Sequence, residues 1–94
     1  MDFVFKPDAS GATGSSTWSA SRFLADELDA STSCSHTTLE LGAGAGYLAM
    51  HLAARGPPGT RVIATDVSDR IRHLRWNVNR NQLGHAVRLI LDAF

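Results

Sequence analysis

The chain has 94 residues, 44% of them apolar, which allows one small domain or a piece of a larger one. Nine basic and nine acidic side chains leave no net charge, so bulk electrostatics give no reason to bind nucleic acid or a membrane. The single cysteine, Cys34, excludes an internal disulfide and favours a reduced setting, the cytoplasm or the nucleus. No apolar run approaches the roughly 20 residues of a membrane helix, and neither a signal peptide nor a zinc-ligand spacing is evident.

The first third of the chain divides into a loop and a helix. Residues 1–16 include the stretch DASGATGSS and are expected to form a flexible segment in front of a domain at 17–94. A helix is expected from residue 17, because apolar side chains recur at every fourth position: Ala20, Leu24 and Leu28.

Three short apolar runs then alternate with two helical patterns. The runs TTLEL, RVIAT and VRLIL, at residues 37–41, 61–65 and 87–91, indicate buried strands. The first of the two helices ends at Gly56, before two prolines, and the second is expected to have Ser68 as its cap. This order predicts the βαβαβ half of a doubly wound, Rossmann-like α/β fold, with the second strand beside the first and the third outside the second.

The first strand of such a half-sheet forms an open edge. A complete doubly wound sheet continues past this strand with further parallel strands. We therefore expect the chain to be a partial domain, which a partner supplying the other half of the sheet would complete.

The stretch LELGAGAGYL carries the chemical information. A glycine-rich turn between a buried strand and a helix lets the backbone approach a ligand closely, and the helix N-terminus offers free N–H groups to an anion. The spacing is ExGxGxG from Glu40 to Gly46, whereas dinucleotide-binding proteins have GxGxxG. The third glycine therefore comes one position early for a nicotinamide cofactor.

Two carboxylates accompany the glycines. Asp66 ends the second strand, 20 residues after Gly46, where a carboxylate meets a ribose in this architecture. Glu40 lies on a strand that should be buried on both faces, and a buried carboxylate needs a partner, such as the ammonium group of a ligand.

With these residues the chain resembles the class I, seven-stranded methyltransferases that use S-adenosylmethionine. More narrowly it resembles methyltransferase family 16, which includes calmodulin-lysine and valosin-containing-protein lysine methyltransferases. The segments that carry the resemblance are TGSSTWSASRFLADEL, LELGAGAGYLAMHLAARG, VIATDVSDRIRHLRWNVNRN and LILDAF. They run from about Thr13 to Phe94 and cover only the N-terminal, cofactor-binding part of the family's domain.

The resemblance implies a set of cofactor-binding residues: Trp18, Glu40, Gly42, Ala43, Gly44, Asp66 and Asp92. It places Trp18 against the cofactor, the Gly42–Gly44 turn along its methionine part, Asp66 on the ribose and Asp92 on the adenine amino group. Where the family usually has a tryptophan in its closing segment, this chain has Leu-Asp-Ala-Phe. The family's acid-x-x-aromatic motif after the fourth strand, linked to catalysis and the substrate lysine, has no counterpart because the chain ends first, so no residue is assigned a catalytic role.

Each of these residues also has a purely structural interpretation. Trp18 fits a core position, Glu40 a partly exposed strand-end acid, and Asp66 a helix-start acid. The seven arginines after residue 46 fit a solvated helix face better than a nucleic-acid surface, since no aromatic ladder accompanies them. Surface positions and a helix end account for the alternating asparagines, Asn77, Asn79 and Asn81.

The sequence thus predicts the S-adenosylmethionine-binding half of a methyltransferase, related to enzymes that methylate protein lysines. The intact enzyme would transfer the sulfonium methyl group in line to a neutral amine, with the protein supplying position and desolvation. Two alternatives remain open: a non-catalytic or partner-completed cofactor-binding fragment, and the half-domain of an NAD-dependent oxidoreductase. If the chain is the cofactor-binding half of a methyltransferase or a non-catalytic fragment, it is expected to have no methyltransferase activity in isolation.

Overall fold

The computed structural model describes residues 3–6, 19–31 and 37–91. Its elements follow the order α1 (Ser19–Ser31), β1 (Thr37–Glu40), α2 (Tyr47–Arg55), β2 (Arg61–Asp66), α3 (Ser68–Arg80) and β3 (Val87–Leu91). The three strands form a parallel sheet in the order β1-β2-β3, as the right-handed crossover rule predicts. The expected Rossmann-like half-sheet is confirmed.

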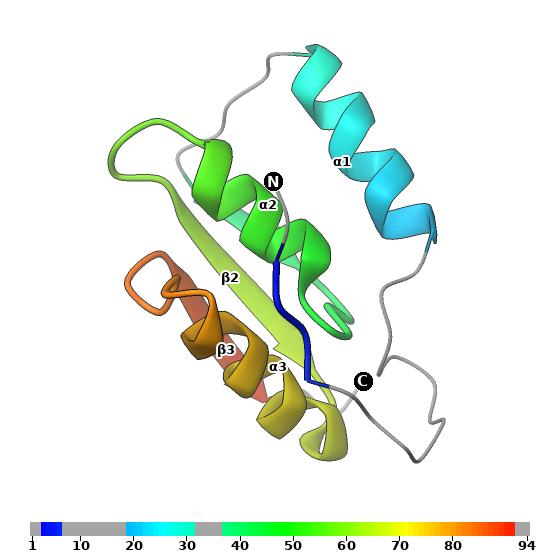
Figure 1. Cartoon of the computed structure of the whole chain (residues 1–94), viewed down its shortest axis with the longest axis vertical. Coiled ribbons are helices and arrows are strands. Elements are labelled where there is room, and N and C mark those ends of the chain that lie inside the picture. The colour runs from blue at the N-terminus through cyan, green and yellow to red at the C-terminus, as the bar shows by residue number, and fades with distance from the viewer. Residues whose placement is uncertain (1–2, 7–18, 32–36, 92–94) are drawn as a thin grey trace.

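The helices lie on one side of this sheet. Helices α2 and α3 cover the strands, and α1 packs against α2 on the outside (Figure 1). In the strand register, Val62 of β2 pairs with Thr38 of β1 and with Val87 of β3, so these side chains share the helix-covered face. The core forms where Val62 and Ala64 meet the fully buried Met50 of α2 and Leu74 of α3.

The opposite face of the sheet is exposed. Leu39 pairs with Ile63, and its side chain is 60% exposed, while Ile90 of β3 is 41% exposed. The expectation that the first strand is buried on both faces is therefore wrong for the described residues. No described element covers this face, and β1 has only β2 as a strand neighbour.

The buried side of α1 differs from the sequence prediction. Ala25 is fully buried, whereas Leu24 is 44% and Phe23 is 67% exposed. The helix meets only α2 closely, so a small side chain at the contact brings the two helices together while the larger apolar ones remain outside.

The end predicted for α2 is confirmed, and the cap predicted for α3 is wrong. Gly56 ends α2 as expected, its N–H donating to Leu52 O at 3.0 Å. Ser68, expected as the cap of α3, is its first helical residue instead, and the N-cap is Val67, with no side-chain cap hydrogen bond. The Asp66 carboxylate accepts a hydrogen bond from Val67 N at 2.7 Å and so satisfies a free N–H at this end of the helix.

Residues 3–6, which we call the N-terminal strap, run between α2 and α3 (Figure 1). Phe3 and Phe5 pack against the core. The strap is tied to α3 by Asn77, which is fully buried, and by Asn81. The interpretation of Asn77 as a surface residue is therefore wrong. The boundary expected at residue 16 lies outside the described residues.

Among the described residues, no helix is long and apolar enough to cross a membrane.

Candidate functional site

The site is built on the turn between β1 and α2. Gly42, Gly44 and Gly46 all adopt positive φ, at 66°, 60° and 96°. L-residues with side chains rarely adopt this conformation, so the glycines permit a tight reversal at the carboxyl end of the sheet. Ala43 N donates to Thr65 O at 2.8 Å and Gly46 N donates to Ala43 O at 3.0 Å, which ties the turn to β2 and to itself.

The two ends of the glycine turn have different surroundings. A Cβ at Gly46 would lie 2.5 Å from Leu74 Cδ1, so this glycine permits close contact between the turn and α3. A Cβ at Gly42 would meet nothing within 4 Å, and Gly42 is exposed whereas residues 43–46 are buried. The first part of the turn therefore presents bare backbone to open space, where a ligand can approach.

Asp66 clamps the turn. Its Oδ2 accepts a hydrogen bond from Gly44 N at 2.6 Å, and its Oδ1 accepts one from Val67 N at 2.7 Å. A carboxylate has about four acceptor positions, so each oxygen retains capacity for a further donor such as a ribose hydroxyl. Asp66 is thus part of the turn's scaffold as well as a candidate ligand-binding group.

Glu40 is the second carboxylate beside the turn. Burial raises the pKa of its carboxyl from 4.5 to about 7; a backbone hydrogen bond from Ala49 opposes this shift, and the negative charge of Asp66 adds to it. Glu40 Oε1 is buried and has no hydrogen-bond partner among the described residues. A buried carboxylate oxygen without a partner is a functional-site signature and fits a cationic ligand group.

Asn77 is the residue that sequence reasoning missed. Its Nδ2 donates to Ala45 O, inside the glycine turn, at 2.8 Å, and its Oδ1 accepts from Lys6 N at 2.7 Å. The available signal was the four-residue spacing of Asn77 and Asn81, which puts both on one face of a helix. Asn79 lies two positions from each of them and therefore on another side of the helix, so the alternation of all three asparagines does not indicate a shared face.

The structure thus brings together Glu40, the Gly42–Gly44 turn with Ala43, and Asp66. The other two predicted cofactor-binding residues, Trp18 and Asp92, lie outside the described residues, as does Phe94. Within the described ranges, no group of three or more His, Cys, Asp or Glu is placed to hold a metal ion.

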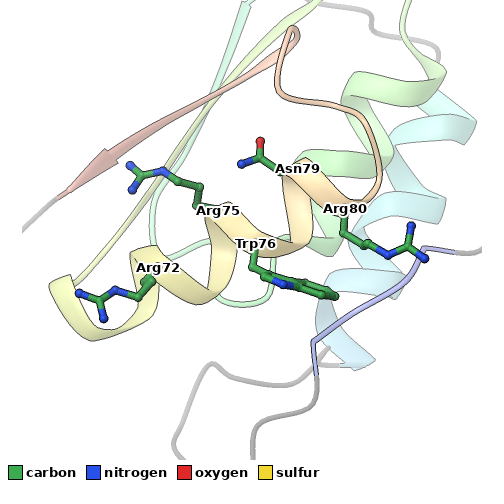
Figure 2. Close-up of a pocket in the computed structure, with 5 residues that line it drawn as sticks. All are labelled: Arg72, Arg75, Trp76, Asn79 and Arg80. Carbon is green, nitrogen blue, oxygen red and sulfur yellow. The ribbon is translucent and has the colours of Figure 1, made fainter.

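A separate open hollow lies on the outer side of α3 (Figure 2). Its lining residues are Arg72, Arg75, Trp76, Asn79 and Arg80. They occupy the side of the helix opposite the buried Leu74 and Asn77, so the hollow is separate from the glycine turn. The three arginines are exposed.

Comparison with solved structures identifies the class of fold. An O-methyltransferase from Bacillus cereus in complex with SAH matches with a TM-score of 0.70 and 22% identity, over 90% of this chain and 38% of that one. A putative O-methyltransferase from Klebsiella pneumoniae matches with a TM-score of 0.68 and 17% identity, over 87% and 37%. One from Nostoc punctiforme matches with a TM-score of 0.66 and 12% identity, over 79% and 22%. The fold is that of Rossmann-like methyltransferases, and this chain spans less than two fifths of each of these proteins.

The sequence then identifies the family. The model of the lysine methyltransferase family, methyltransferase family 16, matches residues 3–91. The chain belongs to this family, and the match corresponds to its N-terminal part. A comparison with curated proteins finds no match.

Family membership implies S-adenosylmethionine as the cofactor, and the residues present fit it. The unpartnered Glu40 Oε1 suits the ammonium group of the methionine part. The open space beside Gly42 suits close backbone approach, and the remaining acceptor capacity of Asp66 suits ribose hydroxyls.

Proposed function

We propose that this chain is the cofactor-binding part of an S-adenosylmethionine-dependent methyltransferase whose substrate is a lysine side chain of a protein. The family match and the resemblance of the glycine turn to family 16 support the lysine substrate. The bound cofactor would supply an electrophilic methyl group on sulfur. The residues of this chain bind and orient the cofactor and shield it from water.

The observation that carries the proposal is the convergence of three features at one end of the sheet. Glu40 Oε1 is buried without a partner, the Gly42 backbone faces open space, and the Asp66 carboxylate is held 2.6 Å from Gly44 N. In the proposed complex, Glu40 pairs with the ammonium group and Asp66 accepts the ribose hydroxyls. We further propose Trp18 and Asp92 as contacts to the cofactor, on the strength of the resemblance alone.

Calorimetric titration of the purified chain with S-adenosylhomocysteine and, separately, with NAD tests the choice of cofactor. We expect S-adenosylhomocysteine to bind more tightly, because the third glycine precedes its place in the dinucleotide motif. Gly42→Ala, whose Cβ would enter the open space at the turn, is expected to weaken this binding. Gly59→Ala is its matched control, since Gly59 also has positive φ but lies in the α2–β2 turn with open space around it. Tighter binding of NAD would contradict the proposal.

The methyl acceptor is tested with labelled S-adenosylmethionine, a cell lysate and analysis of the labelled amino acid. The chain alone is expected to transfer no methyl group, because the residues proposed for the site all contact the cofactor and none is proposed to contact the methyl acceptor. A chain extended by the corresponding part of the domain, or joined by a partner that completes the sheet, is expected to yield methyl-lysine. Label in another product would contradict the lysine substrate, and no label from a complete domain would favour the non-catalytic alternative.

We propose the cytoplasm or the nucleus as the location, which agrees with a single cysteine and a protein substrate.

A further inference from the structure

Asn77 connects two backbone segments that lie far apart in the sequence. Its Nδ2 donates to Ala45 O in the glycine turn at 2.8 Å, and its Oδ1 accepts from Lys6 N of the N-terminal strap at 2.7 Å. Asn77 has no exposed surface, so a change at either end leaves a buried polar atom unpaired. Both segments therefore depend on the orientation of one amide.

The contact with Ala45 fixes a particular peptide unit. Ala45 C=O and Gly46 N–H belong to the same rigid peptide plane. The carbonyl is held by Asn77, and the N–H donates to Ala43 O at 3.0 Å. The preceding residue, Gly44, is the one whose N–H is bound by Asp66. The orientation of this plane thus constrains the part of the turn that the proposed cofactor would contact.

The strap also makes aromatic contacts with the residue that follows the glycine turn. Phe5 stacks on Tyr47 with centroids 6.4 Å apart and planes 25° apart, and Phe3 meets Tyr47 edge-on at 6.0 Å. Tyr47 is the first residue of α2 and directly follows Gly46. The strap therefore supports both the carbonyl before Gly46 and the ring after it.

Asn81 ties the strap down without touching the turn. Its Oδ1 accepts from Val4 N at 2.8 Å, and its Nδ2 donates to Val4 O and to Asn77 O, both at 2.7 Å. Asn77 and Asn81 thus hold the same segment from the same face of α3, and only Asn77 also contacts a residue of the glycine turn.

We propose that Asn77 is a positioning residue for cofactor binding and that the strap, residues 3–6, acts through it to hold the glycine turn in its binding conformation. Displacement of the strap lowers cofactor affinity although the strap itself need not touch the cofactor. This inference rests on the proposed function and adds to it a dependence of the site on a segment more than 30 residues earlier in the chain.

The test compares Asn77→Asp with Asn81→Asp. Each substitution keeps the side chain's shape and the acceptor oxygen for the strap and removes the amide donors. Only the first removes the donor to Ala45 O. In the full chain we expect the dissociation constant of S-adenosylhomocysteine to rise about tenfold for Asn77→Asp and less than twofold for Asn81→Asp, with thermal stability lowered in both.

Hydrogen exchange of the Gly44 and Gly46 amides in the ligand-free chain gives a second readout, which does not require the proposed function. We expect exchange about tenfold faster in Asn77→Asp than in Asn81→Asp, because only Asn77→Asp loses the donor to Ala45 O, while the strap N–H groups keep their acceptor oxygens at both positions. If Asn77→Asp does not fold, deletion of residues 1–6 replaces it in the same comparison.

Equal effects of the two variants on affinity and on exchange would overturn the proposal, since they would show that only overall stability matters. Unchanged affinity and exchange in Asn77→Asp would also overturn it. A wild-type chain that does not bind S-adenosylhomocysteine would contradict the proposed function, and the exchange comparison would still decide the role of Asn77.

Discussion

The two ends of the glycine turn share a backbone conformation and differ in what surrounds them. Gly46 faces inward, where a Cβ would meet Leu74 Cδ1 at 2.5 Å, while Gly42 faces open space. Both have positive φ, so conformational strain alone does not distinguish them. The inner glycine serves the fold, and the outer glycine leaves room for a ligand. Stability measurements and binding measurements should therefore separate them.

The largest effect is expected for Gly46→Ala. The new Cβ introduces strain at φ 96° and a collision with a fully buried leucine, which together lower the free energy of unfolding by about 2–5 kcal/mol. Urea denaturation measures this change. Gly59→Ala, with φ 90° and no neighbour within 4 Å, carries the strain without the collision and should lose about 1–2 kcal/mol. Equal losses in the two variants would show that the contact with Leu74 is unimportant.

Asp66→Ala should affect both properties. It removes the acceptor of Gly44 N and Val67 N, so we expect unfolding of the ligand-free chain to become easier by about 1–3 kcal/mol. Loss of the proposed ribose contacts should weaken S-adenosylhomocysteine binding by about 1.5–3 kcal/mol, the range for hydrogen bonds to a charged group. Calorimetry and urea denaturation on one preparation measure the two. Normal binding with lowered stability would reduce Asp66 to a scaffold residue.

The local part of the site could be predicted from the sequence and the long-range part could not. Local sequence patterns predict the first strand, the glycine turn, the helix after it and the acid that follows the second strand. The register of parallel strands then places that acid, Asp66, beside the turn. The contact of Asn77 with Ala45 spans 32 positions and depends on how α3 rotates against the turn, which no local pattern fixes. The missing partner of Glu40 Oε1 likewise depends on side-chain placement.

The fold shows the same division. Strand order and the helix end at Gly56 follow from chirality and from turn chemistry, and both are confirmed. The exposure of Leu39 and Phe23 depends on what covers each surface, and apolar periodicity carries no information about that. Periodicity identified α1 as a helix and misplaced its buried side, because Ala25, rather than Leu24, is the fully buried residue.

Glu40 gives a pH-dependent prediction. Its pKa is about 7 in the folded chain against 4.5 for the ordinary carboxyl, so folding favours its protonated form. The stabilisation linked to Glu40 is complete below pH 4.5 and is lost as the pH rises through 7. Glu40→Gln, which is neutral throughout, should therefore become more stable relative to wild type with rising pH, by up to about 2–3 kcal/mol at pH 8.

Urea denaturation of both proteins between pH 4.5 and 8 measures this difference. Contributions that the two proteins share cancel in the difference. A difference that does not vary with pH would mean that the Glu40 carboxyl is hydrated in the folded chain and titrates normally.

The smallest effect on stability is expected for Gly42→Ala, the counterpart of Gly46→Ala at the outer end of the turn. Its Cβ meets nothing within 4 Å, so only the strain at φ 66° remains, about 1–2 kcal/mol. The same methyl group projects into the space assigned to the methionine part of the cofactor, so binding of S-adenosylhomocysteine should weaken at least tenfold, about 1.4 kcal/mol. Gly59→Ala has the same kind of strain away from the site and should bind normally. If Gly42→Ala bound as tightly as Gly59→Ala, the open space beside Gly42 would have no role in binding, and the distinction between the two ends of the turn would be one of packing alone.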